Sequence, residues 1–192
     1  MKIKMQLLSD AIFGSGVSVP GGEDISVLCD RDGFPYYKGG TFKGMFREEL
    51  YRYLEWTMEE EAEREATVAR LLGKGGDSSL ADAGKLTFSD FTLSGVVKEK
   101  VLEEVGTAEG HAEVITELLT HTRTLTAMEE DGIVQEGSLR TLRCVNRGLY
   151  FYSEILCAKE EEALVKEVFS LMKWIGSMRN RGFGKVKITV EE

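Results

Sequence analysis

The chain passes from its last predicted helix to its last predicted strand through Gly176-Ser177-Met178-Arg179-Asn180-Arg181-Gly182-Phe183-Gly184-Lys185-Val186. This segment combines three glycines and three cations with no acid, in a chain whose net charge is −9. Glycines let backbone N–H groups approach an anion closely, and Arg and Lys donate hydrogen bonds to phosphate. The segment is typical of a polyanion-binding loop. The alternative is a basic turn whose glycines only satisfy backbone geometry.

Regular elements are predicted on both sides of this loop. Lys159 to Met172 has apolar residues at helical spacing and begins with glutamates, which the helix dipole favours in a first turn. Val186 to Val190 follows as a strand. Lys2 to Leu8 and Gly148 to Leu156 alternate apolar with polar residues, the pattern of half-buried strands. We therefore predict a sheet and a helix next to the loop.

The first half of the chain adds a helix and a further strand after a long connection. Ser9 to Gly40 is rich in Gly, Pro, Ser and Asp, and a loop of about thirty residues in a compact domain is functional or disordered. Thr41 is predicted to cap a helix whose acidic continuation reaches Leu72. Lys85 to Leu93 alternates imperfectly, which predicts a strand with a bulge.

An excursion separates this strand from the next one. Threonines alternate with other residues from Thr120 to Thr126, and Glu130-Asp131-Gly132 then favours a turn, so residues 95–148 are expected to hold a projecting β-hairpin. The full order is strand, helix, strand, excursion, strand, helix, strand. This is an α+β, ferredoxin-like (RRM-like) βαββαβ core with a long first loop and an inserted hairpin. We expect a single domain over 1–192, with 95–148 as its insertion.

Composition limits the class of protein. A chain of 192 residues with 42% apolar content can bury one full core. Its negative charge argues against indiscriminate nucleic-acid binding, so any such contact must use the local basic clusters in 137–147 and 171–187. The three cysteines form no pairing motif, which predicts no zinc site and a reducing, cytoplasmic location. No segment approaches the length of a membrane span, and we expect no membrane partner.

Four segments in sequence order resemble the RAMP superfamily, the repeat-associated proteins of CRISPR systems. The first three are the glycine loop with its G-x-x-R-x-R-G-F-G-x-V pattern, Pro35 to Arg47, and Arg70-Leu71-Leu72-Gly73 followed by Gly84 to Asp90. The fourth comprises Thr120-His121-Thr122-Arg123 and Gly137-Ser138-Leu139-Arg140, which are similar to the thumb hairpin of the type III backbone subunit. A Cys-x-x-Cys pair of several relatives is replaced here by Ala66-Thr67-Val68-Ala69, so the resemblance implies no zinc.

The resemblance implies a filament subunit. It would bind a CRISPR guide RNA and single-stranded target RNA beside copies of itself and other effector subunits, and its thumb would kink the guide–target duplex. It also implies an endoribonuclease that, when assembled, cuts the target with one loop aspartate and Mg²⁺ or Mn²⁺. Counted from the family's landmarks, that catalytic and metal-binding residue is Asp24, with Glu23 as the alternative. Asp24 as an ordinary turn residue remains equally open.

Further residues are candidates for RNA contacts, although ordinary solvated or packing roles remain alternatives for Lys43, Arg47, His121 and Phe183. For Arg140, Arg143 and Arg147 the alternative is pairing with the abundant glutamates. The RNA-binding candidates are Thr41, Lys43, Arg47, His121, Arg123, Arg140, Arg143, Arg147, Gly176, Arg179, Arg181, Gly182, Gly184 and Lys185. Two other functions stay open. One is a non-catalytic backbone or capping subunit, and the other is a guide-processing endoribonuclease that uses His121 as acid or base.

Overall fold

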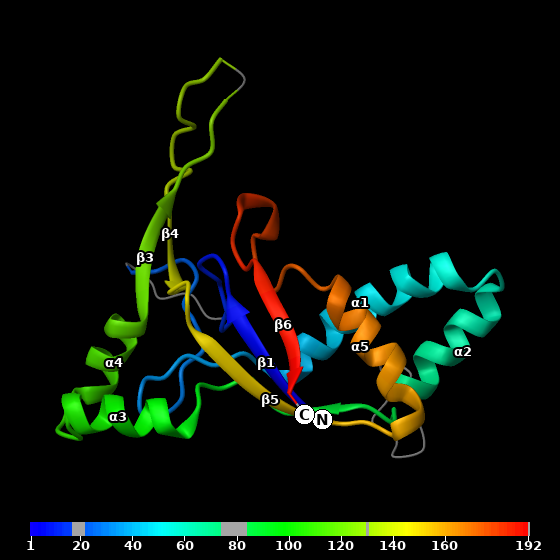
Figure 1. The fold of residues 1–192 in the computed structure, drawn as a ribbon. Coiled ribbons are helices and arrows are strands. Elements are labelled where there is room, and N and C mark those ends of the chain that lie inside the picture. The colour runs from blue at the N-terminus through cyan, green and yellow to red at the C-terminus, as the bar shows by residue number, and fades with distance from the viewer. Residues whose placement is uncertain (17–21, 74–83, 130, 192) are drawn as a thin grey trace.

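The computed structural model describes residues 1–16, 22–73, 84–129 and 131–191. A four-stranded antiparallel sheet has the order β2-β5-β1-β6, formed by β1 (Lys2–Leu7), β2 (Thr87–Phe88), β5 (Tyr150–Leu156) and β6 (Val186–Glu191). In β1 the register opposes Lys4 to Tyr152 of β5 and to Thr189 of β6. Helices α1 (Gly39–Thr57) and α5 (Glu162–Leu171) follow the first and third of these strands (Figure 1). The ferredoxin-like βαββαβ plan is confirmed.

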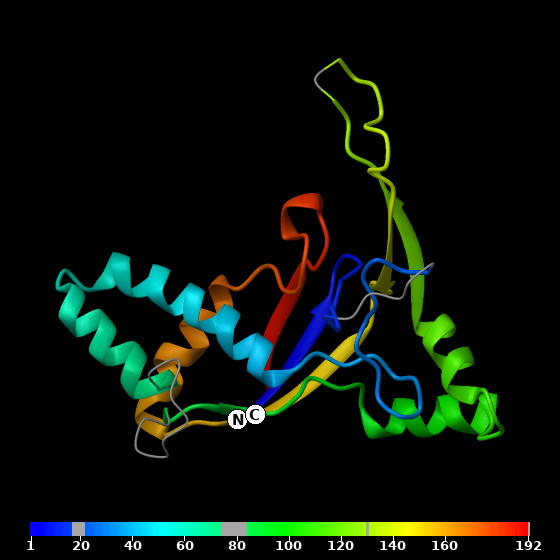
Figure 2. The same cartoon turned by 180° about the vertical axis from the view of Figure 1, so that it is seen from behind.

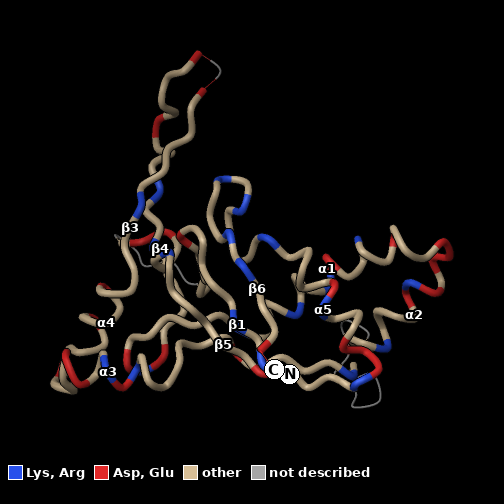
Figure 3. The backbone as a smooth tube through the Cα atoms, viewed as in Figure 1, with Lys and Arg blue, Asp and Glu red and all other residues tan. Residues whose placement is uncertain are grey.

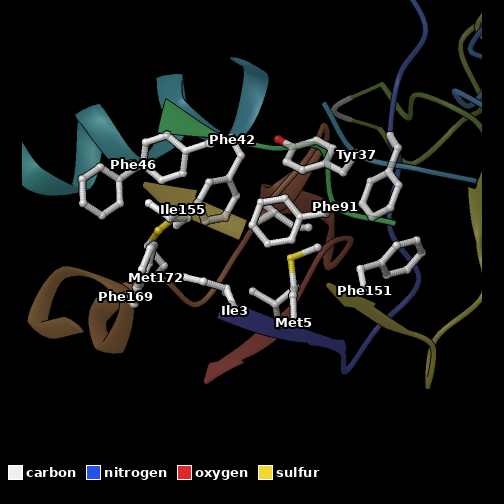
Figure 4. Packing of buried hydrophobic residues seen from close by; sticks show 14 of the residues in the cluster. Ile3, Met5, Tyr37, Phe42, Phe46, Phe91, Phe151, Ile155, Phe169 and Met172 are labelled. Atoms are coloured by element: carbon white, nitrogen blue, oxygen red, sulfur yellow. The ribbon is translucent and has the colours of Figure 1, made fainter. Parts of the chain in front are cut away.

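The core lies between the sheet and these two helices. Period-two alternation places Ile3, Met5 and Phe151 on one face of the sheet, each fully buried. Spacings of four on α1 bring Phe42 and Phe46 against that face, where Phe46 and Phe169 of α5 have ring centroids 5.2 Å apart. Figure 4 shows these side chains interleaving across the layer. Burial of these apolar side chains stabilises the fold.

The edge strand β2 has the predicted bulge. Phe88 pairs with Ile155, and Thr92 bridges Tyr152. The three residues between Phe88 and Thr92 therefore face the two residues between Tyr152 and Ile155 of β5. Ser89 occupies the bulge, where its Oγ accepts a hydrogen bond from the Glu154 N–H over 2.8 Å.

The long predicted helix is divided into two, which corrects the expectation of one helix up to Leu72. Helix α1 ends at Thr57, and α2 (Glu61–Leu72) turns back alongside it, as Figure 2 shows. The Arg64 guanidinium donates to the Met58 and Glu59 carbonyls and closes the turn. On the return path Arg70 forms an ion pair with Glu161, which is 6% exposed and lies in the 3₁₀ turn Lys159–Glu161 before α5. A tertiary ion pair thus fixes the position of α2.

Thr41 does not cap α1, which corrects a second expectation. The helix begins two residues earlier, at Gly39, and its N-cap residue Lys38 makes no side-chain cap. The cap comes instead from Asp90, whose Oδ1 accepts the Gly39 N–H over 2.8 Å. A Cβ at Gly39 would overlap the Phe88 and Ser89 carbonyls. The close contact with the end of β2 therefore requires glycine at position 39. The side chain of Asp90 takes the place of a local N-cap residue.

The excursion contains two helices that the sequence pattern did not indicate, α3 (Gly95–Val105) and α4 (His111–Leu119). Helix α4 runs directly into β3 (Thr120–Leu125), which pairs with β4 (Arg140–Val145) as the predicted projecting hairpin (Figure 1). Glu130 of the predicted turn lies outside the described residues. The assignment of 1–192 as one domain with an insertion stays a prediction.

The long first loop folds back on itself and along the hairpin. Leu28 N–H donates to the Phe13 carbonyl, and Ile25 bridges Leu142 of β4 in parallel. Asp30 accepts N–H bonds from Asp32 and Phe34, so this acid is a turn residue as its sequence context predicts. Residues 17–21 of the loop lie outside the description. No described helix is both long and apolar enough to cross a membrane.

Candidate nucleic-acid interface

Alternation sorts the side chains of the hairpin into two faces. Opposed pairs in the β3–β4 register share a face, so His121, Arg123 and Arg140 lie on the side that also carries Leu142. Leu142 is fully buried there against Ile12 and Phe183. The cationic side chains at the base of the hairpin therefore face the glycine loop.

The glycine loop approaches this face with an unusual backbone. Gly176, Gly182 and Gly184 have positive φ angles, and between them lies a 3₁₀ turn, Arg179–Arg181. A Cβ at Gly184 would overlap the Ile175 carbonyl, so this position requires glycine for space as well as for backbone conformation. The glycines thus have a structural role, whatever the loop binds.

Phe183 of this loop packs inward. It is 2% exposed, and the Arg123 guanidinium carbon lies 5.0 Å from the centre of its ring. Of the two roles weighed for Phe183, base stacking or packing, the geometry supports packing. This cation–π contact between Phe183 and Arg123 links the loop to the hairpin.

A cleft of about 380 Å³ separates the upper hairpin from the glycine loop. Arg140 lines it from β4 and Arg181 from the loop, together with Glu136. Within the described ranges, neither Arg140 nor Arg181 forms an ion pair with an acid. Figure 3 shows the charge pattern, with cations at the base of the hairpin and acids toward its tip. The basic base of the hairpin is the end suited to a polyanion.

Asp10 links three of the candidate residues, a role that the sequence pattern did not indicate. Its Oδ2 lies 3.5 Å from His121 Nε2 and 3.6 Å from Arg123 Nη1, and its Oδ1 accepts the Arg147 N–H. The other ring nitrogen of His121 is 2.6 Å from Asn146 Oδ1. Both nitrogens of His121 therefore have partners, as expected of a positioning or packing residue.

Asp24 lies against β4, at the edge of that strand. Its Oδ2 accepts the Thr141 N–H over 2.7 Å, and its own N–H donates to the Thr141 carbonyl. The Asp24 side chain is exposed, and its partner Thr141 follows Arg140 in the sequence. Glu23, the alternative candidate, is held by Arg143 at 2.5 Å and 2.6 Å. Asp24 is thus the more available carboxylate of the two.

Arg143 and Arg147 do not line up with Arg140. Arg143 lies on the opposite face of the hairpin, where it pairs with Glu23 and donates to Thr120 Oγ1. Arg147 is exposed in the turn before β5. In the loop, Arg179 Nη2 is 3.5 Å from Glu48, and Lys185 is exposed. These arginines therefore form no continuous track, and their RNA roles stay predictions.

The candidates on α1 are placed differently from expectation. Arg47 Nη2 donates to the Leu72 and Gly73 carbonyls, so it caps the C-terminus of α2. Asp90 Oδ1 accepts the Gly39 N–H, the first of α1. The helix N-terminus near Lys43 is therefore not open to a phosphate at that amide, contrary to expectation. Burial and the neighbouring Arg47 lower the pKa of Lys43. Thr41 is exposed.

The metal implied by the resemblance can be compared with the donors present. Among residues 1–16, 22–73, 84–129 and 131–191, no three His, Cys, Asp or Glu side chains form a metal cluster. Asp24 offers one carboxylate, and the nearby Glu23 is neutralised by Arg143. Mg²⁺ commonly binds through one or two carboxylates, waters and substrate phosphates. The donor set fits that mode, in which RNA completes the coordination.

Comparison with known proteins agrees with this architecture. The model of the RAMP superfamily matches residues 4–187. The sequence matches no curated protein. Two solved structures are similar over 97% and 98% of this chain and 95% of the other chain in each case, with 13% identity. They are the type III-B Cmr-beta bound to cognate target RNA, with a TM-score of 0.68, and Cmr-beta in the apo state, with 0.69. At this identity the likeness shows a shared fold.

Proposed function

The chain belongs to the RAMP superfamily, and from that premise we propose that it binds single-stranded guide RNA in the cleft beside the glycine loop, as a subunit of a type III CRISPR effector complex. In that complex it assembles with further copies and other subunits, and Asp24 cleaves the target RNA. The similarity to a Cmr-beta structure bound to cognate target RNA supports the choice of ligand.

One observation carries the proposal: two arginines that form no ion pair with any acid of the described residues converge on one cleft from distant segments. Arg140 and Arg181 line opposite sides of it in a chain that is otherwise acidic. Guanidinium groups match phosphate with two parallel hydrogen bonds. Their convergence gives a negatively charged backbone a defined path between the hairpin and the loop.

The surrounding residues hold this path in place. Phe183 lies under Arg123, and Asp10 lies beside the same guanidinium, so the base of the hairpin keeps its position against the loop. Arg123 is therefore fixed, and a cation held in this way binds a polyanion without losing much side-chain entropy. The acidic tip of the hairpin repels phosphate and directs the RNA toward the base.

For cleavage, Asp24 supplies a carboxylate whose direction is set by the Thr141 N–H. A divalent ion bound there would stabilise negative charge on a phosphate and orient the 2′-OH. Thr141 contacts only one carboxylate oxygen of Asp24, and no other described residue bonds to the second, which would be the ligand of that ion. Glu23 instead balances Arg143 and keeps the loop against β4.

The test uses the assembled complex with guide RNA, complementary RNA and Mg²⁺. Asp24→Ala should abolish target cleavage and preserve target binding, measured on denaturing gels and by filter binding. Asp32→Ala is the matched control, because Asp32 is another acid of the same loop and lies beside Arg31 and His111. Unchanged cleavage by Asp24→Ala would remove Asp24 from the mechanism, and no cleavage by the wild type would identify a non-catalytic or capping subunit.

The guide-binding part is tested separately. Arg140→Gln with Arg181→Gln should reduce the amount of small RNA that co-purifies with the protein. Arg31→Gln should not, because its side chain is 92% exposed and does not line the cleft. Cleavage of repeat RNA by the isolated protein without metal, lost in His121→Ala, would instead establish the guide-processing alternative.

A further inference from the structure

The sheet has a second face, opposite the core, that the proposed function does not use. Residues of β1, β5 and β6 alternate outward onto it and are exposed or half-buried. No described helix of this chain packs on that side, because α1 and α5 both cover the face that carries Ile3 and Met5 (Figure 4). The outward residues are Lys2, Lys4, Gln6, Tyr150, Tyr152, Glu154, Leu156, Lys187, Thr189 and Glu191.

The register arranges these residues in rows across the sheet. The first row opposes Gln6 to Tyr150 and to Lys187. The second row opposes Lys4 to Tyr152 and to Thr189, and both acids of β5 and β6 fall in the third row, opposite Lys2. The first two rows thus hold two tyrosines and two lysines with no acid. We call these two rows the tyrosine face.

The spacing of the tyrosine face suits successive nucleotides. Tyr150 and Tyr152 are two residues apart on one strand, so their attachment points are roughly 6.6 Å apart on the same side. Tyr150 is 41% exposed, and the Lys4 ammonium lies over its ring, 4.8 Å from the centroid. A base that stacks on this face of the ring replaces the ammonium, which can then pair with a phosphate.

The face is also continuous with the glycine loop along the chain. Lys187 follows Lys185 by two residues, and β6 begins directly after the loop at Val186. The core of an interface between copies is depleted of lysine. The tyrosine face carries two lysines and no acid, and its positive charge complements a polyanion.

We propose that the tyrosine face binds two successive nucleotides of single-stranded RNA, with their bases on Tyr150 and Tyr152 and their phosphates beside Lys4 and Lys187. The inference rests on the proposed function only for the class of ligand. It adds a second RNA-contacting surface on the opposite side of the sheet from the helices, distinct from the cleft. Single strands are preferred, because paired bases cannot lie flat on the rings.

The test uses the purified full-length chain, freed of RNA, and a fluorescein-labelled oligouridylate. Stacking of one base is worth about 1–3 kcal/mol, so Tyr150→Leu or Tyr152→Leu should weaken binding about 5- to 150-fold by anisotropy. Tyr150→Phe keeps the ring and should stay within about twofold of wild type. Tyr51→Leu is the matched control, since Tyr51 is 37% exposed on α1, away from this face.

A second readout does not depend on affinity. Oligouridylate containing 4-thiouridine should cross-link on illumination to peptides that carry Tyr150 or Tyr152, identified by mass spectrometry. Unchanged affinity in both leucine variants, with no cross-link, would overturn the inference. Loss of self-association in sedimentation, with RNA affinity unchanged, would overturn it too and make the face a contact between copies. If the leucine variants weaken RNA binding but the wild-type complex does not cleave target RNA, only the proposed role of Asp24 is refuted.

Discussion

Replacing Arg47 with methionine tests whether this residue serves the fold or binds RNA directly. Its guanidinium donates to the Leu72 and Gly73 carbonyls at 3.1 Å and 3.0 Å, where α2 ends. The methionine side chain retains most of the apolar stem and removes only the charged donor. The substitution therefore isolates the cap from side-chain packing.

The magnitude follows from the geometry. A hydrogen bond from a charged donor contributes about 1.5–3 kcal/mol, and here one nitrogen serves two carbonyls of a helix C-terminus. We expect a loss of about 2 kcal/mol in the free energy of unfolding. For a chain of this length that lowers Tm by about 4–8 °C. Thermal unfolding followed by circular dichroism measures it.

The control lies on the same helix. Arg52 is exposed and pairs with Glu49 one turn away, so Arg52→Met should change stability by less than about 0.5 kcal/mol. Below its Tm, Arg47→Met should bind RNA as the wild type does. An unchanged Tm together with a tenfold loss of RNA affinity would refute the structural role and restore Arg47 as an RNA ligand.

Two further predictions concern the glycine loop and the core. Gly184→Ala should destabilise the protein by more than about 2 kcal/mol, because its Cβ would overlap the Ile175 carbonyl. Gly182→Ala has open space around its Cβ and should lose only about 1 kcal/mol of stability, for its positive φ. Urea unfolding compares the two variants, and equal losses of stability would contradict the packing argument. Burial raises the pKa of Tyr37 from 10.0 to about 12, so its contribution to stability is complete below pH 10 and is lost as pH rises toward 12, at about 1.4 kcal/mol per pH unit. Tyr37→Phe should remove that part of the pH dependence between pH 9 and 11.5, and parallel curves for the two proteins would exclude Tyr37 as its source.

Local patterns sufficed for the elements that face the core. Ile3 and Met5 alternate with lysines, and Phe42 and Phe46 recur at a helical interval, so the sequence predicts which sides are buried. The positions of the glycines likewise predict the turn before β6. These features are visible because burial on one side of an element leaves a short-range period.

Two features of the helices escaped prediction. Helix α3 was not predicted although Val97, Val101 and Val105 recur at intervals of four; it has no fully buried residue, and Val101 and Val105 are half-buried against the core. The division of α1 from α2 depends on Arg64 reaching back to Met58 and Glu59, a contact that no hydrophobic pattern reports. This division lies outside what periodicity can detect.

The candidate site was predictable in composition and not in arrangement. The basic loop and the basic hairpin were both evident, and the structure brings Arg140 and Arg181 to one cleft. It gives Arg47 and Arg143 partners within the fold instead. The positioning roles of Asp10 and Asp90 were not predicted, because each acts on residues far away in the chain.

By itself the sequence determined the βαββαβ order, the buried side of each main element and the basic character of the glycine loop. These properties follow from interactions between residues a few positions apart. The tertiary structure alone decided which cations stay available for a polyanion, that Asp24 lies against β4, and that two tyrosines share an open sheet face. A charged side chain pairs with whichever backbone carbonyl or carboxylate lies close to it in space. Only the folded chain brings those distant partners within hydrogen-bonding distance.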